Sequence, residues 1–165
     1  MTLHQNGAIL TPSDETATVT SMDFLTFEDN YLAGQSPERK IIMTNKEKAL
    51  ALIGTFVSGD TAKAKELLAP GYIQHNLAFG TGADAFVAAV EGLAQAPVKT
   101  TVNNIRAFED GDKVFLQTVY NFAGAGEQVG FDVFRFDADG KIAEHWDVME
   151  TLADKSTWAN ENGKF

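Results

Sequence analysis

The segment from Gly130 to Val148, GFDVFRFDADGKIAEHWDV, constrains the fold of this 165-residue chain more than any other stretch. It predicts two β-strands joined by a turn at 137–140, where a glycine supplies the positive φ that tight hairpins need. Strand side chains alternate between the two faces of a sheet. With a symmetric loop, Asp132 stands directly opposite His145, and their Cβ atoms lie about 5 Å apart. The hairpin therefore predicts a carboxylate beside an imidazole on one face.

The rest of the chain divides into a helical half and a strand half. Apolar residues at helical spacing predict three helices, and alternating residues further on predict strands. The helices are expected at 44–58, 61–68 and 83–94, a short extended segment at 72–76, and two strands at 99–108 and 113–122 before the hairpin. Thr44 and Glu47 form a possible capping box at the first helix. This order indicates an α+β domain, with helices packed on one face of a curved, antiparallel meander.

Symmetric loops throughout the meander place four polar side chains in one row across its strands. They are Asn104, Gln117, Asp132 and His145. Their predicted neighbours on that face include Phe115, Phe134 and Asp147. A polar line in an apolar wall is typical of a small-molecule pocket. A single β-bulge would slide one strand and break the row.

The opposite face of the predicted sheet is too apolar for a surface exposed to solvent. Its expected members are Ile105, Leu116, Tyr120, Phe131, Val133, Ile142, Trp146 and Val148. One face has to cover the helices and the pocket. We therefore expect the other to form a homodimer through the sheet, centred on Trp146, Val133 and Leu116.

Charge and composition limit the possible partners and compartments. The formal net charge is −10, which argues against nucleic acids and anionic membranes because phosphate groups need a cationic surface. There is no cysteine, so disulfides and thiolate metal sites are excluded. No apolar run of about 18 residues predicts a membrane span. No basic and then apolar N-terminus predicts a signal peptide, so a cytoplasmic protein is expected.

The chain is expected to contain one domain with two extensions. Residues 1–43 begin polar and rich in threonine and then become apolar, which indicates an arm that is partly disordered or docked on a partner. The domain spans 44–150, and 151–165 form a C-terminal tail or flap.

Four segments resemble the SnoaL-like branch of the NTF2-like superfamily, which includes polyketide cyclases. They are YIQHN at 72–76, GTGADAF at 80–86, GDKV at 111–114 and FDVFRFDADGKIAEHWDV at 131–148. The resemblance covers 44–150 and implies a cone in which N-terminal helices and a curved, mostly antiparallel sheet enclose a pocket. It also implies aldol-type ring closure without metal or organic cofactor, with Asp132 as general base. Relatives usually have proline where this chain has Leu77, and many have histidine at Gln117.

These observations together predict a site for acid–base chemistry. A carboxylate in an apolar pocket can abstract a proton next to a carbonyl group, and a neighbouring donor can stabilise the enolate oxygen. Asp132 and His145 are the predicted catalytic residues. The predicted substrate-binding residues are His75, Asn76, Asn104, Phe115, Gln117, Phe134 and Asp147.

The expected ligand is a small apolar or carbonyl-containing molecule, because the turn at 123–126 is more compact than in the polyketide cyclases. No metal site is predicted, since only His75 and His145 accompany the carboxylates and no ligand spacing unites them. Two alternatives stay open. One is a non-catalytic domain that binds an apolar metabolite, and the other is a dimerisation module with a vestigial pocket.

Overall fold

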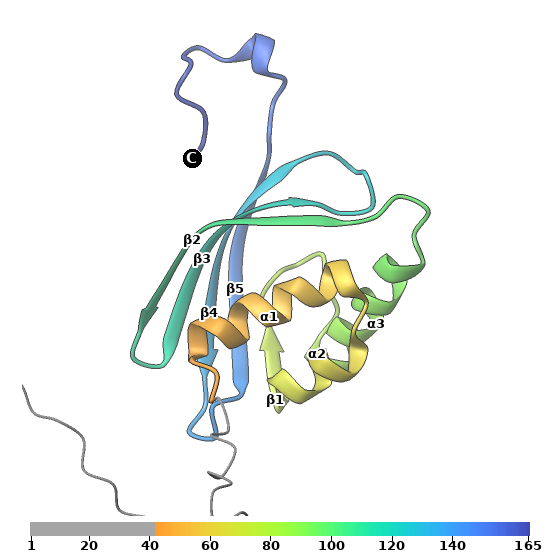
Figure 1. Cartoon of the computed structure of the whole chain (residues 1–165), viewed down its shortest axis with the longest axis vertical. Helices are drawn as coiled ribbons and strands as arrows, with labels where there is room; N and C mark the ends of the chain where they lie inside the picture. The colour runs from red at the N-terminus through yellow and green to blue at the C-terminus, as the bar shows by residue number, and fades with distance from the viewer. Residues whose placement is uncertain (1–41) are drawn as a thin grey trace, which may run out of the picture. The chain divides into compact units, whose positions relative to one another are not determined.

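The computed structural model describes residues 42–165, and the predicted arm therefore lies almost entirely outside the described residues. The described part consists of three helices packed on one face of a five-stranded sheet (Figure 1). The helices are α1 (Asn45–Ser58), α2 (Thr61–Leu67) and α3 (Gly82–Gln95). The strands are β1 (Leu68–Gln74), β2 (Thr101–Asp110), β3 (Lys113–Asn121), β4 (Gln128–Phe136) and β5 (Ile142–Thr151), followed by a short 3₁₀ helix, η1 (Lys155–Thr157). The predicted α+β fold is confirmed.

Local signals define the first helix as predicted. The Thr44 side chain accepts a hydrogen bond from the Glu47 backbone N–H, and the Glu47 carboxylate accepts one from the Thr44 N–H, which completes the capping box. At the other end Gly59 adopts a left-handed φ of 72° and donates its N–H to the Thr55 carbonyl. The apolar stripe of α1 is buried against the sheet through Ala49, Leu52, Ile53 and Phe56.

The sheet has the strand order β1-β5-β4-β3-β2. All neighbouring strands are antiparallel except β1, which runs parallel to β5 at the edge. A short extended segment was predicted at 72–76, but the strand starts earlier and includes Pro70-Gly71. Proline is tolerated there because β1 is an edge strand. This strand places Gln74 beside His145.

The predicted polar row is wrong, because no hairpin of the meander has the symmetric loop assumed for it. Asp132 pairs with Asp147, and His145 pairs with Phe134. Between β3 and β4 the register differs from the prediction by one residue, so Leu116 rather than Gln117 stands opposite Asp132. Since a one-residue slip exchanges the two faces of a strand, Gln117 and Phe115 lie on the outer face.

The β2–β3 hairpin turns at Gly111-Asp112, and its register shifts between Asn104 and Arg106. Arg106 therefore pairs with Gln117, and Asn104 pairs with Thr118.

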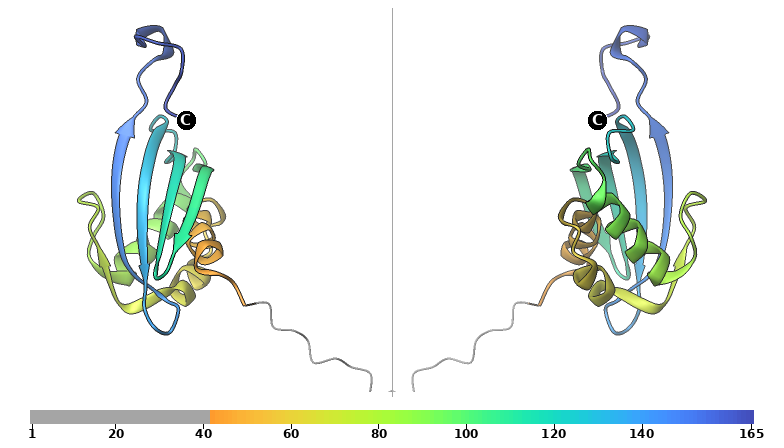
Figure 2. Two further views of the ribbon diagram at one scale, coloured as in Figure 1. Left: turned by 90° about the vertical axis from the view of Figure 1, so that its left-hand side faces the viewer. Right: turned by 90° about the vertical axis from the view of Figure 1, so that its right-hand side faces the viewer.

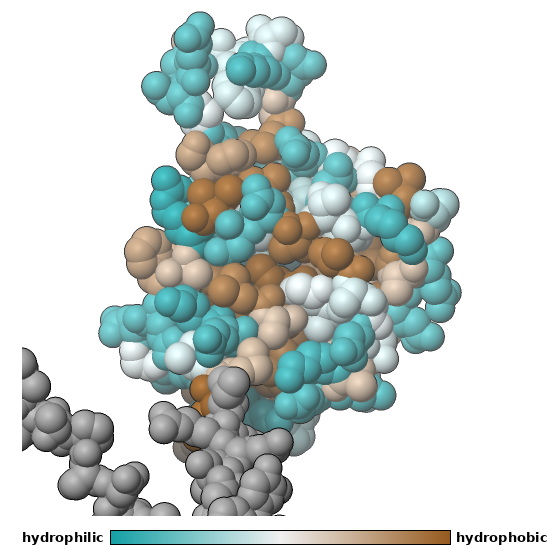
Figure 3. Space-filling model, viewed as in Figure 1, coloured by the Kyte–Doolittle hydropathy of each residue, from teal (hydrophilic) through white to brown (hydrophobic). Residues whose placement is uncertain are grey.

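The core lies between the helices and the inner face of the sheet. Three residues predicted on the outer face, Leu116, Tyr120 and Ile142, are buried there. The β3–β4 register places Leu116 and Tyr120 on the inner face. Ile142 faces inward because the register of β4 and β5 shifts between Arg135 and Phe136. In the view of Figure 1, apolar residues cross the middle of the surface, with charged residues above and below them (Figure 3). Within 42–165, no helix has the length and hydropathy to cross a membrane.

The C-terminal residues extend beyond the end of β5, past the end of the sheet and away from the helices (Figure 2). The chain then returns toward the sheet, where the Gln117 side-chain amide donates to the Lys164 carbonyl at 3.0 Å. The Lys164 ammonium pairs with Glu150 at 2.7 Å. These contacts hold the segment against the outer face.

Candidate functional site

A pocket lies between the helices and the inner face of the sheet. It is lined by Ile53, Phe56, Gln74, Asn76, Phe79, Phe86, Tyr120, Phe122, Asp132, Phe134, His145, Asp147 and Met149. Most of these side chains are apolar, and the polar ones come from β3, β4, β5, β1 and the segment that follows β1. The cavity volume of about 30 Å³ is enough for about two water molecules. A larger ligand therefore needs side chains of the wall to move.

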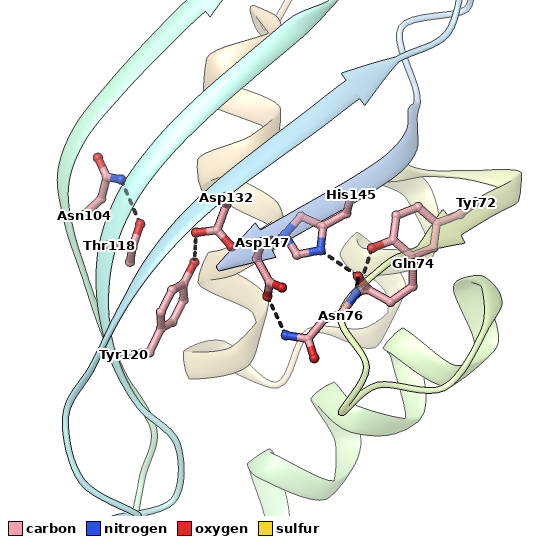
Figure 4. A network of polar contacts seen from close by, with 9 residues as sticks. All are labelled: Tyr72, Gln74, Asn76, Asn104, Thr118, Tyr120, Asp132, His145 and Asp147. Atoms are coloured by element: carbon pink, nitrogen blue, oxygen red, sulfur yellow. Dashed lines mark hydrogen bonds and ion pairs between the residues drawn. The ribbon is translucent and has the colours of Figure 1, made fainter. Parts of the chain in front are cut away.

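Asp132 is the more deeply buried of the two carboxylates in this pocket, with 3% of its surface exposed. Its Oδ1 lies 3.1 Å from His145 Nε2, and its Oδ2 accepts a hydrogen bond of 2.8 Å from the Tyr120 hydroxyl (Figure 4). A buried carboxylate is costly unless it is paired and hydrogen-bonded. Both of its oxygens have such partners.

The Tyr120 ring can reach Asp132 because Gly130, which lies between them on β4, has no side chain. A Cβ atom at Gly130 would lie 2.7 Å from Tyr120 Cε2 and 2.8 Å from Met149 Sδ, closer than real Cβ contacts. Burial and then the charge of Asp132 raise the pKa of the Tyr120 hydroxyl well above its ordinary value. The hydroxyl therefore stays protonated and donates to Asp132.

Gln74 determines which nitrogen of His145 carries a proton. Its Oε1 accepts the Asn76 backbone N–H at 2.9 Å, and its Nε2 donates to the Tyr72 hydroxyl at 3.0 Å. These two partners orient the amide, so the atom 2.8 Å from His145 Nδ1 is the oxygen. Because an amide oxygen can only accept, Nδ1 is the protonated donor.

This orientation leaves His145 Nε2 facing Asp132 Oδ1. Without a proton between them, a nitrogen lone pair would face a carboxylate oxygen, which is repulsive. The pair is therefore either imidazolium with carboxylate or neutral imidazole with carboxylic acid. In both forms it holds one mobile proton, and the Phe134 ring stacks on the imidazole with centroids 4.4 Å apart.

We predict that Gln74→Leu changes the protonation pattern of the His145 ring. The variant removes the acceptor of Nδ1–H, so the ring is expected to become a mixture of tautomers. ¹⁵N NMR should show Nδ1 fully protonated in the wild type and partly unprotonated in the variant. The buried Tyr72 hydroxyl also loses its partner, so we expect a loss of about 1–3 kcal/mol in unfolding free energy. The control is Gln117→Leu on the outer face. Unchanged ring nitrogens in Gln74→Leu would contradict the assignment.

Asp147 lies opposite Asp132 in the register of β4 and β5. Its Oδ2 accepts a hydrogen bond from the Asn76 side-chain amide, whose own oxygen is oriented by the Ala78 backbone N–H (Figure 4). One donor atom each of Asp132, His145 and Asp147 lies within 4.8 Å of the other two. Two carboxylates and an imidazole suit a divalent cation such as Zn²⁺. Such an ion would have to displace the proton that Asp132 and His145 share.

The predicted site residues fall into two groups. Those that line the pocket are Asp132, His145, Asn76, Phe134 and Asp147. The predicted placement of four others in the pocket is wrong: His75, Asn104, Phe115 and Gln117. The β3–β4 register places the Phe115 and Gln117 side chains on the outer face. Asn104, on β2, donates a hydrogen bond to Thr118 Oγ1 on β3.

Neighbouring side chains in an extended segment point to opposite faces. Gln74 lines the pocket, so His75 points away from it. Its ring stacks on Trp146 with centroids 4.9 Å apart and an interplanar angle of 6°. Its Nε2 lies 2.9 Å from Glu144, which also pairs with Arg135 at 2.9 Å. These contacts lower the pKa of Glu144, the hydrogen bond to His75 being the larger cause. The residues that could hold a metal ion include Asp147 and not His75, because the β4–β5 register places Asp147 opposite Asp132.

Three residues that are hydrogen-bonded to Asp132 or His145, directly or through Gln74, were not predicted from the sequence: Tyr72, Gln74 and Tyr120. The first two could have been found, since alternation in YIQHN places Tyr72, Gln74 and Asn76 on one face. Tyr120 could not, because its face depends on the β3–β4 register. Burial and the charges of Asp147 and Asp132 raise the pKa of the Tyr72 hydroxyl, so it also stays protonated.

The comparison with protein families supports the resemblance of the sequence. A model of the SnoaL-like domain matches residues 49–145, more than half of the chain. The chain belongs to the SnoaL-like domain family. This confirms the family predicted from the hairpin and the YIQHN segment. Among curated proteins there is no significant match.

Solved structures of several kinds of protein share the fold of this chain. An NTF2-like protein of unknown function from Cytophaga hutchinsonii is 17% identical with a TM-score of 0.57, covering 67% of this chain and 94% of that one. IdmH, a putative polyketide cyclase from Streptomyces antibioticus, is 22% identical with a TM-score of 0.52, covering 66% and 93%. An LEH-like epoxide hydrolase from M. tuberculosis is 18% identical with a TM-score of 0.51, covering 65% and 86%. At these identities the likeness shows the NTF2-like fold alone.

Proposed function

We propose that this SnoaL-like domain is a cytoplasmic lyase or isomerase that acts on a small carbonyl compound without metal or organic cofactor. The observation that carries the proposal is the buried Asp132–His145 pair, whose Oδ1 and Nε2 lie 3.1 Å apart at the end of an apolar pocket. Acid–base catalysis needs such a group within reach of the substrate. The fold neighbours include a putative polyketide cyclase and an epoxide hydrolase, and both names are consistent with a small-molecule pocket.

In the proposed reaction Asp132 takes a proton from the carbon next to the carbonyl group. The C–H bond breaks, an O–H bond forms on Asp132, and the electron pair becomes the enolate. Asn76 lines the pocket, and its side-chain amide has a second N–H besides the one it donates to Asp147. This N–H would stabilise the enolate oxygen. Tyr120 keeps its proton and holds the second oxygen of Asp132. The enolate then either takes a proton at another carbon or attacks a second carbonyl in an aldol step.

Deuterium exchange tests this proposal without knowledge of the natural substrate. Small aldehydes and ketones, such as butanal, butanone and cyclohexanone, are incubated with the protein in D₂O. Proton NMR then follows the loss of the hydrogens next to the carbonyl group. We expect the wild-type protein to accelerate exchange in at least one compound. Exchange at the buffer rate for all of them would contradict a catalytic role.

A binding domain without catalysis is the second candidate. The observation in its favour is the small cavity, about 30 Å³, with aromatic side chains over most of its wall. Such a pocket can hold an apolar group while leaving little space for a reaction. Ligand binding together with an absence of exchange would favour this function.

We also propose that the domain forms a homodimer through the outer face of the sheet. This face carries an apolar patch, the outer patch, formed by Phe108, Phe115, Phe131, Val133, Trp146 and Val148. The phenylalanine rings follow one another with centroid distances of 6.3 and 6.0 Å. Leu116, predicted in this interface, is in the core instead. Apolar patches of this kind mark interaction sites.

Phe131→Asp is expected to convert the dimer into a monomer, because the charge would be buried without a partner at the centre of the outer patch. Light scattering after size-exclusion chromatography measures the mass. The matched control is Leu77→Asp, which places the same charge on a fully exposed apolar residue away from the patch. A monomeric wild type, or a dimer unaffected by Phe131→Asp, would contradict the interface.

A further inference from the structure

The polar end of the pocket carries an excess of negative charge. Its lining contains two carboxylates, Asp132 and Asp147, and no lysine or arginine. His145 is the one basic group of the lining, and its Nε2 faces Asp132. The neutral partners of the two carboxylates are the Tyr120 hydroxyl and the Asn76 amide. With one proton on the Asp132–His145 pair, the site keeps the negative charge of Asp147 without a cation beside it.

Aromatic rings form the wall next to this charge. Phe56 lies at the centre of the cluster, with its ring centroid 6.1 Å from that of Phe79, 5.0 Å from Phe86 and 5.5 Å from Phe122. The faces of aromatic rings attract cations, and the attraction grows when the cation is removed from water. A carboxylate at one end and phenylalanine rings along the side suit a ligand with a positive charge at one end and an apolar body. An anionic ligand would meet two carboxylates and no lysine or arginine.

We propose that the pocket takes a cationic substrate, a protonated amine with an apolar body. The inference rests on the proposed function, because it uses the same pocket and names the class of its substrate. The ammonium group would pair with Asp147, and the carbon chain would lie along the phenylalanine wall. Since Asp132 and Asp147 approach within 4.8 Å, the ammonium nitrogen and the carbon that loses its proton are then only a few bonds apart.

A divalent metal ion is the other cation that this end of the pocket could hold. The structure favours the organic cation for two reasons. Asp132 Oδ1 and His145 Nε2 already face each other at 3.1 Å, and a metal ion would have to separate them. The aromatic wall would also contribute nothing to a metal site, because metal ions bind oxygen, nitrogen and sulfur ligands.

Three probes of the same chain length and different charge test the proposal: n-butylammonium, 1-butanol and butyrate. NMR titration of the full-length protein at physiological ionic strength follows the Met149 methyl group and the His145 ring, both of which line the pocket. We expect n-butylammonium to bind at least tenfold more tightly than 1-butanol, and butyrate to bind more weakly than either. Asp147→Asn is expected to remove the preference for the ammonium.

The control variant is Glu144→Gln, which changes the net charge by the same amount on the outer face of the same strand. Glu144→Gln should keep the preference for n-butylammonium, because the proposed cause is the charge of Asp147 in the pocket and not the net charge of the protein. Equal affinity for the three probes, no binding of n-butylammonium, or an unchanged preference in Asp147→Asn would overturn the proposal. So would one equivalent of metal bound in the purified protein. Deuterium exchange that depends on Asp132, together with any of the three binding results, would leave the proposed function in place and remove only the substrate class. Bound metal would contradict the proposed function as well, because that function uses no metal.

Discussion

Asp132→Asn is expected to lower the protein-catalysed rate of deuterium exchange by about 10²-fold or more, the range of a general base. The amide has nearly the same shape as the carboxylate, but it cannot accept a proton under these conditions. It also cannot share the mobile proton with His145. The rate is measured by proton NMR in D₂O with the carbonyl compound that the wild type exchanges fastest.

The control for this variant is Asp139→Asn in the exposed turn between β4 and β5. It removes the same charge without touching the pocket, so exchange should continue at the wild-type rate. Far-ultraviolet circular dichroism should show the same secondary structure in both variants. Full exchange activity in Asp132→Asn would mean that another group abstracts the proton, and the proposed mechanism would then be wrong.

Phe134→Ala is expected to lower the free energy of unfolding by about 3–5 kcal/mol, the usual cost of removing a buried phenylalanine ring. Phe134 is the largest fully buried side chain, with 1% of its surface exposed. Its ring also stacks on His145, so the imidazole loses its support in the variant. Urea unfolding followed by tryptophan fluorescence gives the difference between the variant and the wild type.

Phe131→Ala is the matched control, because it removes the same ring from the same strand on the other face. With 39% of its surface exposed, we expect a smaller loss, about 1 kcal/mol for the monomer, since partial burial gives less transfer free energy. Phe134→Leu should fall between wild type and Phe134→Ala. Equal effects of the two alanine variants would mean that the faces of β4 are assigned incorrectly.

The sequence alone determined the features that depend on neighbouring residues. The capping box of Thr44 and Glu47, the apolar stripe of α1 and the hairpin turn before Lys141 are all local signals, and the structure contains each of them. Asp132 and His145 also share a face as predicted. From Gln128 to Arg135 the register between β4 and β5 differs from the prediction by two residues, and an even shift preserves the face of each side chain there.

The tertiary structure alone decided which side chains surround that pair. The β3–β4 register differs by one residue, and this odd shift exchanges Gln117 for Tyr120 at the pocket. The edge strand β1, which starts before the predicted segment and includes Pro70 and Gly71, brings Gln74 to His145. Strand register depends on bulges and on how all the helices and strands pack at once, whereas a helix cap depends on four residues. Asp132 and His145 could therefore be placed on one face from the sequence, but their partners could not.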